Sequence, residues 1–319
     1  MTGLGFAAAG PLVARAEQQP GRRLPNIGIL NYASAQDVLV NQFRTALNEL
    51  GLVEGQSISL TYRWADGNFE QIPRLVDEML ASKVDVIIAL GPATWAAKRA
   101  TSSVPIVVAF SGDPVGNGVV SNLAHPGGNI TGFSYMSTDL AAKRLELVSR
   151  AFSKNARVAV LYNPDEPATM LEMRETETAA KAIGVALHRL AAQRPDDLDD
   201  CFETAVRERA DAIIVFTHGF AVLNRRRIIE QAARRKIPTM YGWREFVEDG
   251  GLMSYGPNVS MMVRQAASYV GRILKGEKPG DLPVQQPTKI ELSINLRTAK
   301  AQGIDLPPTL LAGADEVIE

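Results

Sequence analysis

The chain has 319 residues, of which 46% are hydrophobic and 22% charged, with a formal net charge of −1. This length allows two ordinary domains, and the composition is that of a globular chain. A net charge close to zero supplies no overall field for nucleic acid or an anionic membrane. The single cysteine, Cys201, can form no internal disulfide, and no Cys/His group has zinc-site spacing, so we expect no metal and no cofactor.

The first 25 residues differ from the rest of the chain. Residues 3–16 are small and apolar and end in Ala14-Arg15-Ala16, which has the small residues that signal peptidase needs. A polar linker, residues 17–25, follows. We expect cleavage near Ala16 and a periplasmic mature protein. The usual basic stretch is missing, so the natural signal is expected to begin further upstream, and a disordered tail is the alternative reading.

Short apolar segments predict strands from Asn26 onward. Runs such as VDVIIAL and DAIIVF fit strands buried on both faces of a parallel sheet. The predicted strands are Asn26–Leu30, Ile58–Arg63, Val84–Leu90, Ile106–Phe110, Ile130–Phe133, Arg157–Tyr162, Val185–Leu190, Asp211–Phe216, Pro238–Tyr241 and Leu252–Tyr255.

Amphipathic stretches between these strands predict helices. They include Val40–Leu50, Ile72–Ser82, Leu140–Phe152, Ala168–Ile183, Leu198–Arg209 and Ala221–Lys236. Regular alternation of strand and helix indicates βαβ units with right-handed crossovers, which is an α/β fold.

The two halves of the chain resemble each other. Val84–Ile88 leads into the turn Gly91–Thr94, and Ala210–Ile214 leads into Thr217–Phe220, each followed one helix later by a strand that begins at proline. We therefore predict two doubly wound parallel-sheet lobes joined by a hinge.

The expected division of the chain has four parts. Residues 1–25 are a signal and linker remnant, 26–136 form lobe 1, 137–256 form lobe 2, and 257–319 cross back to lobe 1 and end in a C-terminal segment. Residues 289–319 are assigned to neither lobe. Hinge points are expected near Tyr135–Thr138 and Tyr255–Val259.

Ligands of open parallel sheets bind beyond the carboxyl ends of the strands, so the turns there predict the site. These turns carry small, hydroxyl, amide, carboxylate and tyrosine side chains. Residues of these types also cap helices and form tight turns, so each candidate has an alternative role in stabilising the fold without ligand contact. The candidate ligand-binding residues are Tyr32, Ser34, Gly91, Pro92, Ala93, Thr94, Ser111, Asp113, Tyr135, Asn163, Thr217, Gly219, Tyr241 and Glu245.

Two of these turns suggest specific roles. The N–H groups at the helix start Gly91–Thr94 suit a ligand carboxylate. Asp113, if buried, suits a ligand ammonium group. Tyrosine rings would supply flat apolar walls with a polar tip. His218 also follows a strand, and ligand contact is weighed there against simple packing.

The sequence gives little support for an enzyme or for a nucleic-acid-binding protein. The sequence has no GxSxG, GxxxxGK[ST], GxGxxG or HExxH motif, so we predict a protein that is not an enzyme. Arg225–Arg227 and Arg234–Lys236 lie on one predicted helix, where consecutive side chains point in different directions. A solvated helix face is the favoured interpretation, and no nucleic-acid partner is expected.

Three longer segments resemble a known family. They are residues 241–257 (YGWREFVEDGGLMSYGP), 123–132 (LAHPGGNITG) and 286–300 (QPTKIELSINLRTAK). From about Asn26 to the C-terminus the chain resembles tryptophan/tyrosine-type ABC transporter substrate-binding proteins, which have the periplasmic-binding type I fold of the leucine-binding class.

The resemblance implies two lobes joined by three crossover segments, with a small-molecule ligand between them. It implies an ABC permease of the inner membrane as partner, a monomeric chain, and a carboxylate-bearing ligand of the amino acid or aromatic acid type. In members that bind aromatic amino acids, the turn matching Gly91–Thr94 holds the carboxylate and the residue matching Asp113 lies near the amine. No twin-arginine pair precedes the apolar stretch of residues 3–16, and no lipobox cysteine lies near the start, which leaves the export route open.

Two other classes remain as alternatives. A cytosolic ligand sensor or repressor core would need a helix-turn-helix of roughly fifty residues in front. The stretch before Asn26 is apolar and then polar, unlike such a domain. An enzyme on the same fold is the second alternative, since fold does not fix function.

Overall fold

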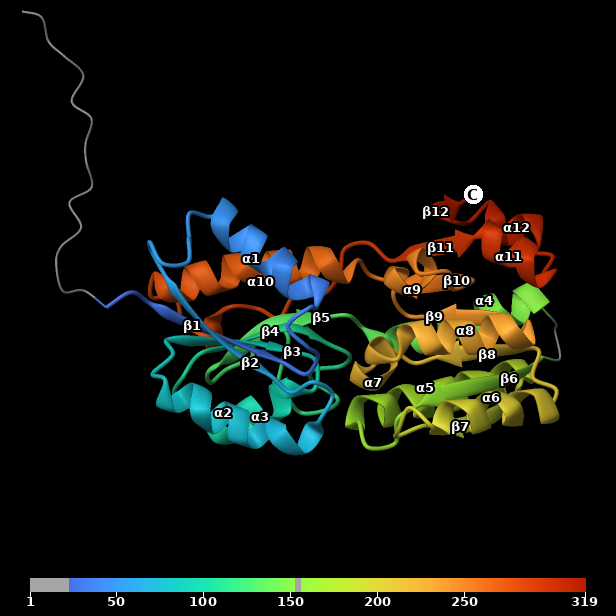
Figure 1. Ribbon diagram of the computed structural model, residues 1–319, viewed down its shortest axis with the longest axis horizontal. Helices are drawn as coiled ribbons and strands as arrows, with labels where there is room; N and C mark the ends of the chain where they lie inside the picture. Colours follow the sequence, from blue (N-terminus) through green and yellow to red (C-terminus); the bar gives the residue numbers. More distant parts are fainter. Residues whose placement is uncertain (1–22, 153–155) are drawn as a thin grey trace, which may run out of the picture.

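The computed structural model describes residues 23–152 and 156–319, and Figure 1 shows two lobes side by side along the long axis. The first lobe contains a parallel sheet of order β2-β1-β3-β4-β5. Its strands are β1 (Asn26–Asn31), β2 (Ser59–Trp64), β3 (Val86–Leu90), β4 (Ile106–Ser111) and β5 (Ile130–Ser134).

The second lobe repeats this topology and extends it. Its sheet has the order β12-β11-β10-β9-β8-β6-β7, so β7-β6-β8-β9-β10 matches the order of the first sheet. The strand β11 runs antiparallel to β10, and β12 runs parallel to β11. The prediction of two doubly wound lobes is therefore confirmed. The strands are β6 (Arg157–Tyr162), β7 (Ala186–Ala191), β8 (Ala212–Val215), β9 (Thr239–Tyr241), β10 (Met253–Gly256), β11 (Glu291–Asn295) and β12 (Glu316–Ile318).

Helices cover both faces of each sheet, and in Figure 1 α1 and α10 lie together over the first sheet while α2 and α3 lie beneath it. In the second lobe, α4 packs on α5, and α6 packs on α8. The α-helices are α1 (Val38–Glu49), α2 (Ile72–Ala81), α3 (Ala93–Ala100), α4 (Ser137–Phe152), α5 (Pro167–Ile183), α6 (Asp197–Arg207), α7 (Gly219–Leu223), α8 (Arg225–Arg235), α9 (Arg244–Glu248), α10 (Val259–Leu274), α11 (Leu296–Gln302) and α12 (Pro308–Leu311), with 3-10 turns at η1 (Phe69–Gln71) and η2 (Pro279–Asp281).

The central strands read as unbroken apolar runs because both of their faces are buried. In β1, Ile27 and Ile29 belong to the core cluster that contains residues of α1 and α10. Leu30 points to the other face, into the cluster with α2 and α3. Successive side chains of a strand alternate between faces, so each strand serves two cores.

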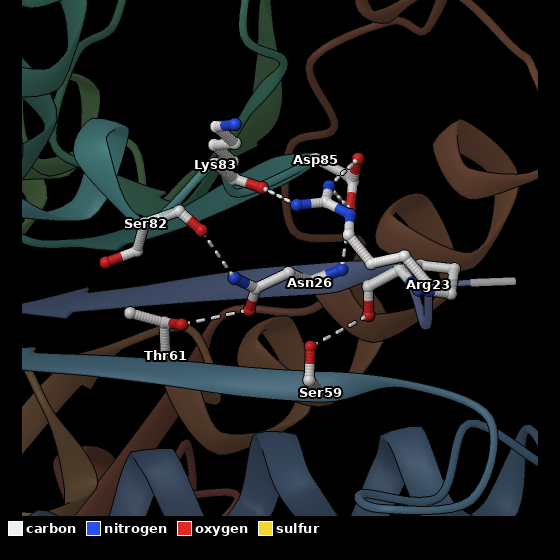
Figure 2. A network of polar contacts seen from close by, with 8 residues as sticks. Arg23, Asn26, Ser59, Thr61, Ser82, Lys83 and Asp85 are labelled. Carbon is white, nitrogen blue, oxygen red and sulfur yellow. Dashed lines mark hydrogen bonds and ion pairs between the residues drawn. The ribbon is translucent and has the colours of Figure 1, made fainter. Parts of the chain in front are cut away.

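An aspartate occupies an equivalent position in each of the two halves. Asp85 lies just before β3, and its Oδ2 accepts the backbone N–H of Asn26 at 2.6 Å. Asp211 lies just before β8, and its Oδ2 accepts the N–H of Arg157 at 2.8 Å. Figure 2 shows that Arg23 adds two bonds to Asp85, of 2.7 and 2.8 Å. Each carboxylate accepts a backbone N–H at the amino-terminal end of the parallel strands. The cavity described below lies at the opposite, carboxyl ends of the strands.

The chain passes between the sheets three times. It leaves the first sheet after β5, returns after β10 to place α10 on α1, and leaves again between Gln285, which pairs with Phe133, and β11. The first two passages fall within the predicted hinge segments Tyr135–Thr138 and Tyr255–Val259. Residues 289–319, which the sequence left unassigned, supply β11 and β12 to the second sheet.

The structure corrects one predicted helix. The stretch Ala221–Lys236 is interrupted, because Asn224 ends α7 and begins α8 with φ −98° and ψ 16°. Its Nδ2 donates to the carbonyl of Phe220 at 2.9 Å, a bond that competes with the helical pattern. Three arginines of α8, Arg225, Arg227 and Arg235, pair with acidic neighbours, as in the 2.9 Å ion pair between Arg227 and Asp199.

Candidate functional site

A cavity of about 550 Å³ lies between the lobes, at the carboxyl ends of β1, β3, β4, β6, β8 and β9. Both lobes and the first crossover supply its walls. Its polar and charged lining residues are Asn31, Asp37, Thr94, Arg99, Ser111, Asn117, Asp165, Glu166, Thr217 and His218, and its aromatic ones are Tyr32, Phe69, Trp95, Phe110, Tyr135 and Trp243.

Three rings form a junction where the lobes meet. Phe110 comes from the first lobe, Tyr135 from the crossover and Trp243 from the second lobe. The ring of Trp243 meets Phe110 edge-on at 5.2 Å between centroids and Tyr135 at 6.0 Å. The hydroxyl of Tyr135 donates to the carbonyl of Thr217 at 2.9 Å. The junction therefore gives the cavity a rigid aromatic wall that belongs to both lobes.

The lobes also touch across the cavity through Tyr32 and Gly219. A Cβ on Gly219 would lie 2.4 Å from the ring of Tyr32, so only glycine allows the ring to approach this closely. The other face of Tyr32 packs against Phe69, with ring centroids 4.4 Å apart. A second contact brings Leu223 of the second lobe against Gly67 of the first. The structure is thus a closed arrangement of the lobes.

A buried acid–histidine pair lies in the second-lobe wall. Nδ1 of His218 is 3.2 Å from Oε1 of Glu166, and their side chains are 2% and 9% exposed. The Nε2 atom of His218 is buried and has no hydrogen-bond partner among the residues that the structure describes. Tyr32 and Glu166 line the same cavity; burial raises the pKa of Tyr32, and the charge of Glu166 raises it further.

The structure brings eight of the fourteen predicted site residues to the cavity. They come from the first strand end of lobe 1, the turn before α3, the end of β4, the crossover and the turn before α7. The residues are Tyr32, Gly91, Pro92, Thr94, Ser111, Tyr135, Thr217 and Gly219.

The other six do not line the cavity, and Asp113, the expected partner of a ligand amine, is among them. Its Oδ1 accepts the backbone N–H of Gly116 at 2.7 Å, so this oxygen closes the turn that Asp113 begins. The six residues outside the lining are Ser34, Ala93, Asp113, Asn163, Tyr241 and Glu245.

The remaining five have structural environments of their own. Tyr241 is fully buried and stacks on Phe246 at 4.6 Å. Glu245 is close to Ser260, and burial raises its pKa. Asn163 accepts the N–H of Asp165 at 3.0 Å in a turn. Ala93 is buried in the core with α2 and α3, and Ser34 is half-buried beside the lining residue Ala33.

The turn Gly91–Thr94, which the sequence predicts to bind a ligand carboxylate, uses some of its polar groups in internal hydrogen bonds. The N–H and the hydroxyl of Thr94 both reach the carbonyl of Gly91, at 3.2 and 2.9 Å. Gly91 has φ +64°, a left-handed conformation that suits glycine. Thr94 therefore fixes the start of α3, and its hydroxyl oxygen retains acceptor capacity.

Sequence reasoning missed several lining residues, above all Glu166, Trp243 and Phe110. All three sit at or just after strand ends that the sequence did identify. The strand-end rule selects the turn, but the side-chain direction within a turn depends on local backbone geometry. His218 was weighed as a ligand contact from the sequence, and the structure places it in the wall.

Within residues 23–152 and 156–319, no group of three or more His, Cys, Asp or Glu side chains could hold a metal ion. Over the same ranges, no helix has the length and apolar character needed to cross a membrane.

Two doubly wound lobes, three chain passages and a cavity between the strand ends define a periplasmic-binding type I fold. The sequence matches the ABC transporter substrate-binding proteins over residues 27–318, and the chain belongs to this family.

Individual relatives agree with the family and the fold. A tyrosine-binding protein of Clostridioides difficile (strain R20291) is 27% identical over 284 residues, which are 88% of this chain and 81% of the relative. A conserved domain protein of Vibrio cholerae is 26% identical with a TM-score of 0.85, covering 92% of this chain and 100% of that one. The ABC domain in complex with L-Trp from Streptococcus pneumoniae is 23% identical with a TM-score of 0.84, covering 93% and 100%.

Proposed function

We propose that this chain is the extracytoplasmic solute-binding subunit of an ABC importer, and that it captures a small carboxylate-bearing ligand between its lobes and delivers it to a permease of the inner membrane. One observation carries the proposal, namely the closed cavity whose aromatic walls come from both lobes and from the crossover. A ligand held there stabilises the closed arrangement because only in that arrangement do both lobes contact it.

The size and lining of the cavity favour an aromatic or apolar ligand body. About 550 Å³ is within the usual range for small-molecule pockets. Rings such as Trp95, Phe110 and Trp243 offer faces and edges against which a flat group packs. The names of the relatives, one a tyrosine-binding protein and one a complex with L-Trp, support a ligand of the aromatic amino acid or aromatic acid type.

Arg99 supports the carboxylate part of the proposal. It lines the cavity from the last turn of α3, is exposed, and forms no ion pair with another residue of the described ranges. Ser111, which also belongs to the first lobe, lines the cavity as well. A guanidinium group recognises a carboxylate through two parallel N–H donors, so Arg99 is the cation best placed to attract an anionic ligand.

Export and quaternary state form part of the same proposal. The cleavage site predicted near Ala16 lies outside the described residues. Mass spectrometry of the exported native protein would give a first residue near Glu17. We propose that the mature chain acts as a monomer in the periplasm, where it captures its ligand and delivers it to the permease.

The direct test is a thermal-shift and calorimetry series on the folded chain. L-tyrosine, L-tryptophan, indole-3-propanoate and 3-(4-hydroxyphenyl)propanoate are the probes, and D-glucose is the control. A ligand at a hundred times its Kd stabilises the fold by about 2.7 kcal/mol, which is a measurable rise in Tm. If none of the four aromatic probes raises Tm or releases heat, the proposed function is wrong.

A further inference from the structure

The carboxylate of Glu166 does not cap the helix that Glu166 begins. Glu166 is the N-cap residue of α5, with φ −95° and ψ 110°, but its side chain makes no capping bond. N-cap side chains commonly accept one of the free N–H groups of the first turn. Here the carboxylate turns toward His218 in the cavity wall, at 3.2 Å, and stays 9% exposed.

The surroundings leave this carboxylate without a compensating cation. No lysine or arginine of the described ranges forms an ion pair with Glu166, and its side chain is hydrogen-bonded there to Nδ1 of His218. The nearby tyrosines give it no hydrogen bond, because Tyr32 donates to the carbonyl of Gly67 at 2.8 Å and Tyr135 donates to that of Thr217 at 2.9 Å. A buried carboxylate is costly unless it is paired and hydrogen-bonded.

The ring of His218 contains a second polar atom, Nε2, that forms no hydrogen bond within the described residues. With the carboxylate ionised, Nδ1 of His218 must carry the proton that bridges to Glu166. In the neutral imidazole, Nε2 is then an acceptor, and it is buried without a partner among these residues. In this tautomer the pair offers a carboxylate and an acceptor nitrogen, and a positively charged N–H donor would satisfy both.

We infer that Glu166 and His218 form the recognition site for a protonated amine on the ligand, so that the protein selects α-amino acids over the corresponding deaminated acids. This inference rests on the proposed function, since it assumes a ligand in the cavity between the lobes. The amine site belongs to the second lobe, whereas Arg99 and the start of α3 belong to the first. The inference therefore places the ammonium on the second lobe and leaves the carboxylate to the first.

The test compares affinities within matched pairs of compounds. Calorimetry measures Kd for L-tryptophan against indole-3-propanoate, and for L-tyrosine against 3-(4-hydroxyphenyl)propanoate, each pair differing only in the amine. The wild-type chain is expected to prefer the amino acid by about ten- to hundredfold, the usual effect of a charge-assisted bond. Glu166→Gln keeps the size and one acceptor oxygen but removes the charge, so the preference should fall to within about threefold.

Two more variants keep the test decisive. Glu175→Gln neutralises an exposed carboxylate on the same helix, and it should leave the preference unchanged. His218→Gln should reduce the preference while leaving the affinity for the deaminated acids nearly intact. Melting curves of all three variants establish that they are folded, and if Glu166→Gln fails to fold, His218→Gln supplies the answer.

The outcomes separate this inference from the proposed function. A wild-type chain that binds the deaminated acids as tightly as the amino acids overturns the amine site but keeps the aromatic-acid ligand. A preference that survives in both Glu166→Gln and His218→Gln also overturns it. A wild-type chain that binds none of the four compounds overturns the proposed function itself, and the amine site falls with it.

Discussion

Arg144 and Glu172 form an ion pair of 2.7 Å in which each side chain is 1% exposed. The same guanidinium bonds to both passages of the chain at the hinge. Its Nε donates to the carbonyl of Tyr255 at 2.9 Å, and its Nη1 approaches that of Ser137 at 3.4 Å. One buried cation on α4 thus holds two crossover segments against α5, and the pair is a structural anchor of the hinge.

Removal of one partner of this pair should be strongly destabilising. Arg144→Met leaves the carboxylate of Glu172 buried without its cation, and such changes cost about 3–5 kcal/mol. The double variant Arg144→Met with Glu172→Met removes both charges and should recover most of that loss. Urea unfolding of the wild type, both single variants and the double variant measures the coupling. Strictly additive losses would show that the pair does not act as a unit.

The pH dependence of stability should report on Glu172. Burial raises the pKa of Glu172 from 4.5 to about 7, and the Arg144 guanidinium offsets this only in part. Between these two values the folded chain binds a proton that the unfolded chain has released, so the contribution of Glu172 to stability falls as the pH rises. Relative to Glu172→Gln, the wild type should lose on the order of 1–3 kcal/mol between about pH 5 and pH 7. Parallel curves for the two proteins would contradict the prediction.

Closure should depend on the absence of a side chain at Gly219. In Gly219→Ala the new methyl group would lie 2.4 Å from the ring of Tyr32, which is itself held between the glycine and Phe69. We expect roughly tenfold weaker ligand binding, since about 1.4 kcal/mol is enough for that factor. The Tm of the ligand-free chain should change little, because opening of the lobes relieves the contact.

Gly271→Ala is the matched control for this variant. A Cβ there would meet its nearest neighbour, Leu52, at an ordinary 3.5 Å, far from the cavity. Its affinity should equal that of the wild type. Small-angle scattering adds a second measurement, in which saturating ligand compacts the wild type more than it compacts Gly219→Ala. Equal affinities for the two alanine variants would show that the lobes do not close on Tyr32.

The apolar runs and the alternation of strands with amphipathic helices were sufficient to predict two doubly wound lobes. The residues Val86–Leu90 are buried on both faces of the sheet, and their uniformly apolar side chains reveal this in the sequence. The antiparallel strand β11 escaped prediction because its five residues, Glu291–Asn295, alternate too briefly to differ from a loop. The break at Asn224 escaped because it depends on one side chain that bonds to the preceding turn.

The site was harder to predict because a turn fixes position but not direction. Asp165 and Glu166 are neighbours in one turn, yet Asp165 is exposed and accepts from Gln193 at 2.7 Å, while Glu166 is buried against His218. Nothing in residue type distinguishes these two carboxylates. Their environments differ because His218 arrives from a strand end 52 residues away in sequence.

The sequence and the structure give opposite expectations for Asp113, and a single variant decides between them. As an amine ligand, Asp113 would make Asp113→Ala lose ten- to hundredfold in affinity for an amino acid. In the structure its carboxylate accepts from Gly116, so the variant should lose about 0.5–1.5 kcal/mol of stability and keep its affinity within about twofold. Asp113→Asn retains an acceptor oxygen and should match the wild type in both respects. Calorimetry with L-tryptophan and indole-3-propanoate, combined with urea unfolding, separates the two roles. A loss confined to the amino acid would return the amine to Asp113 and remove it from Glu166.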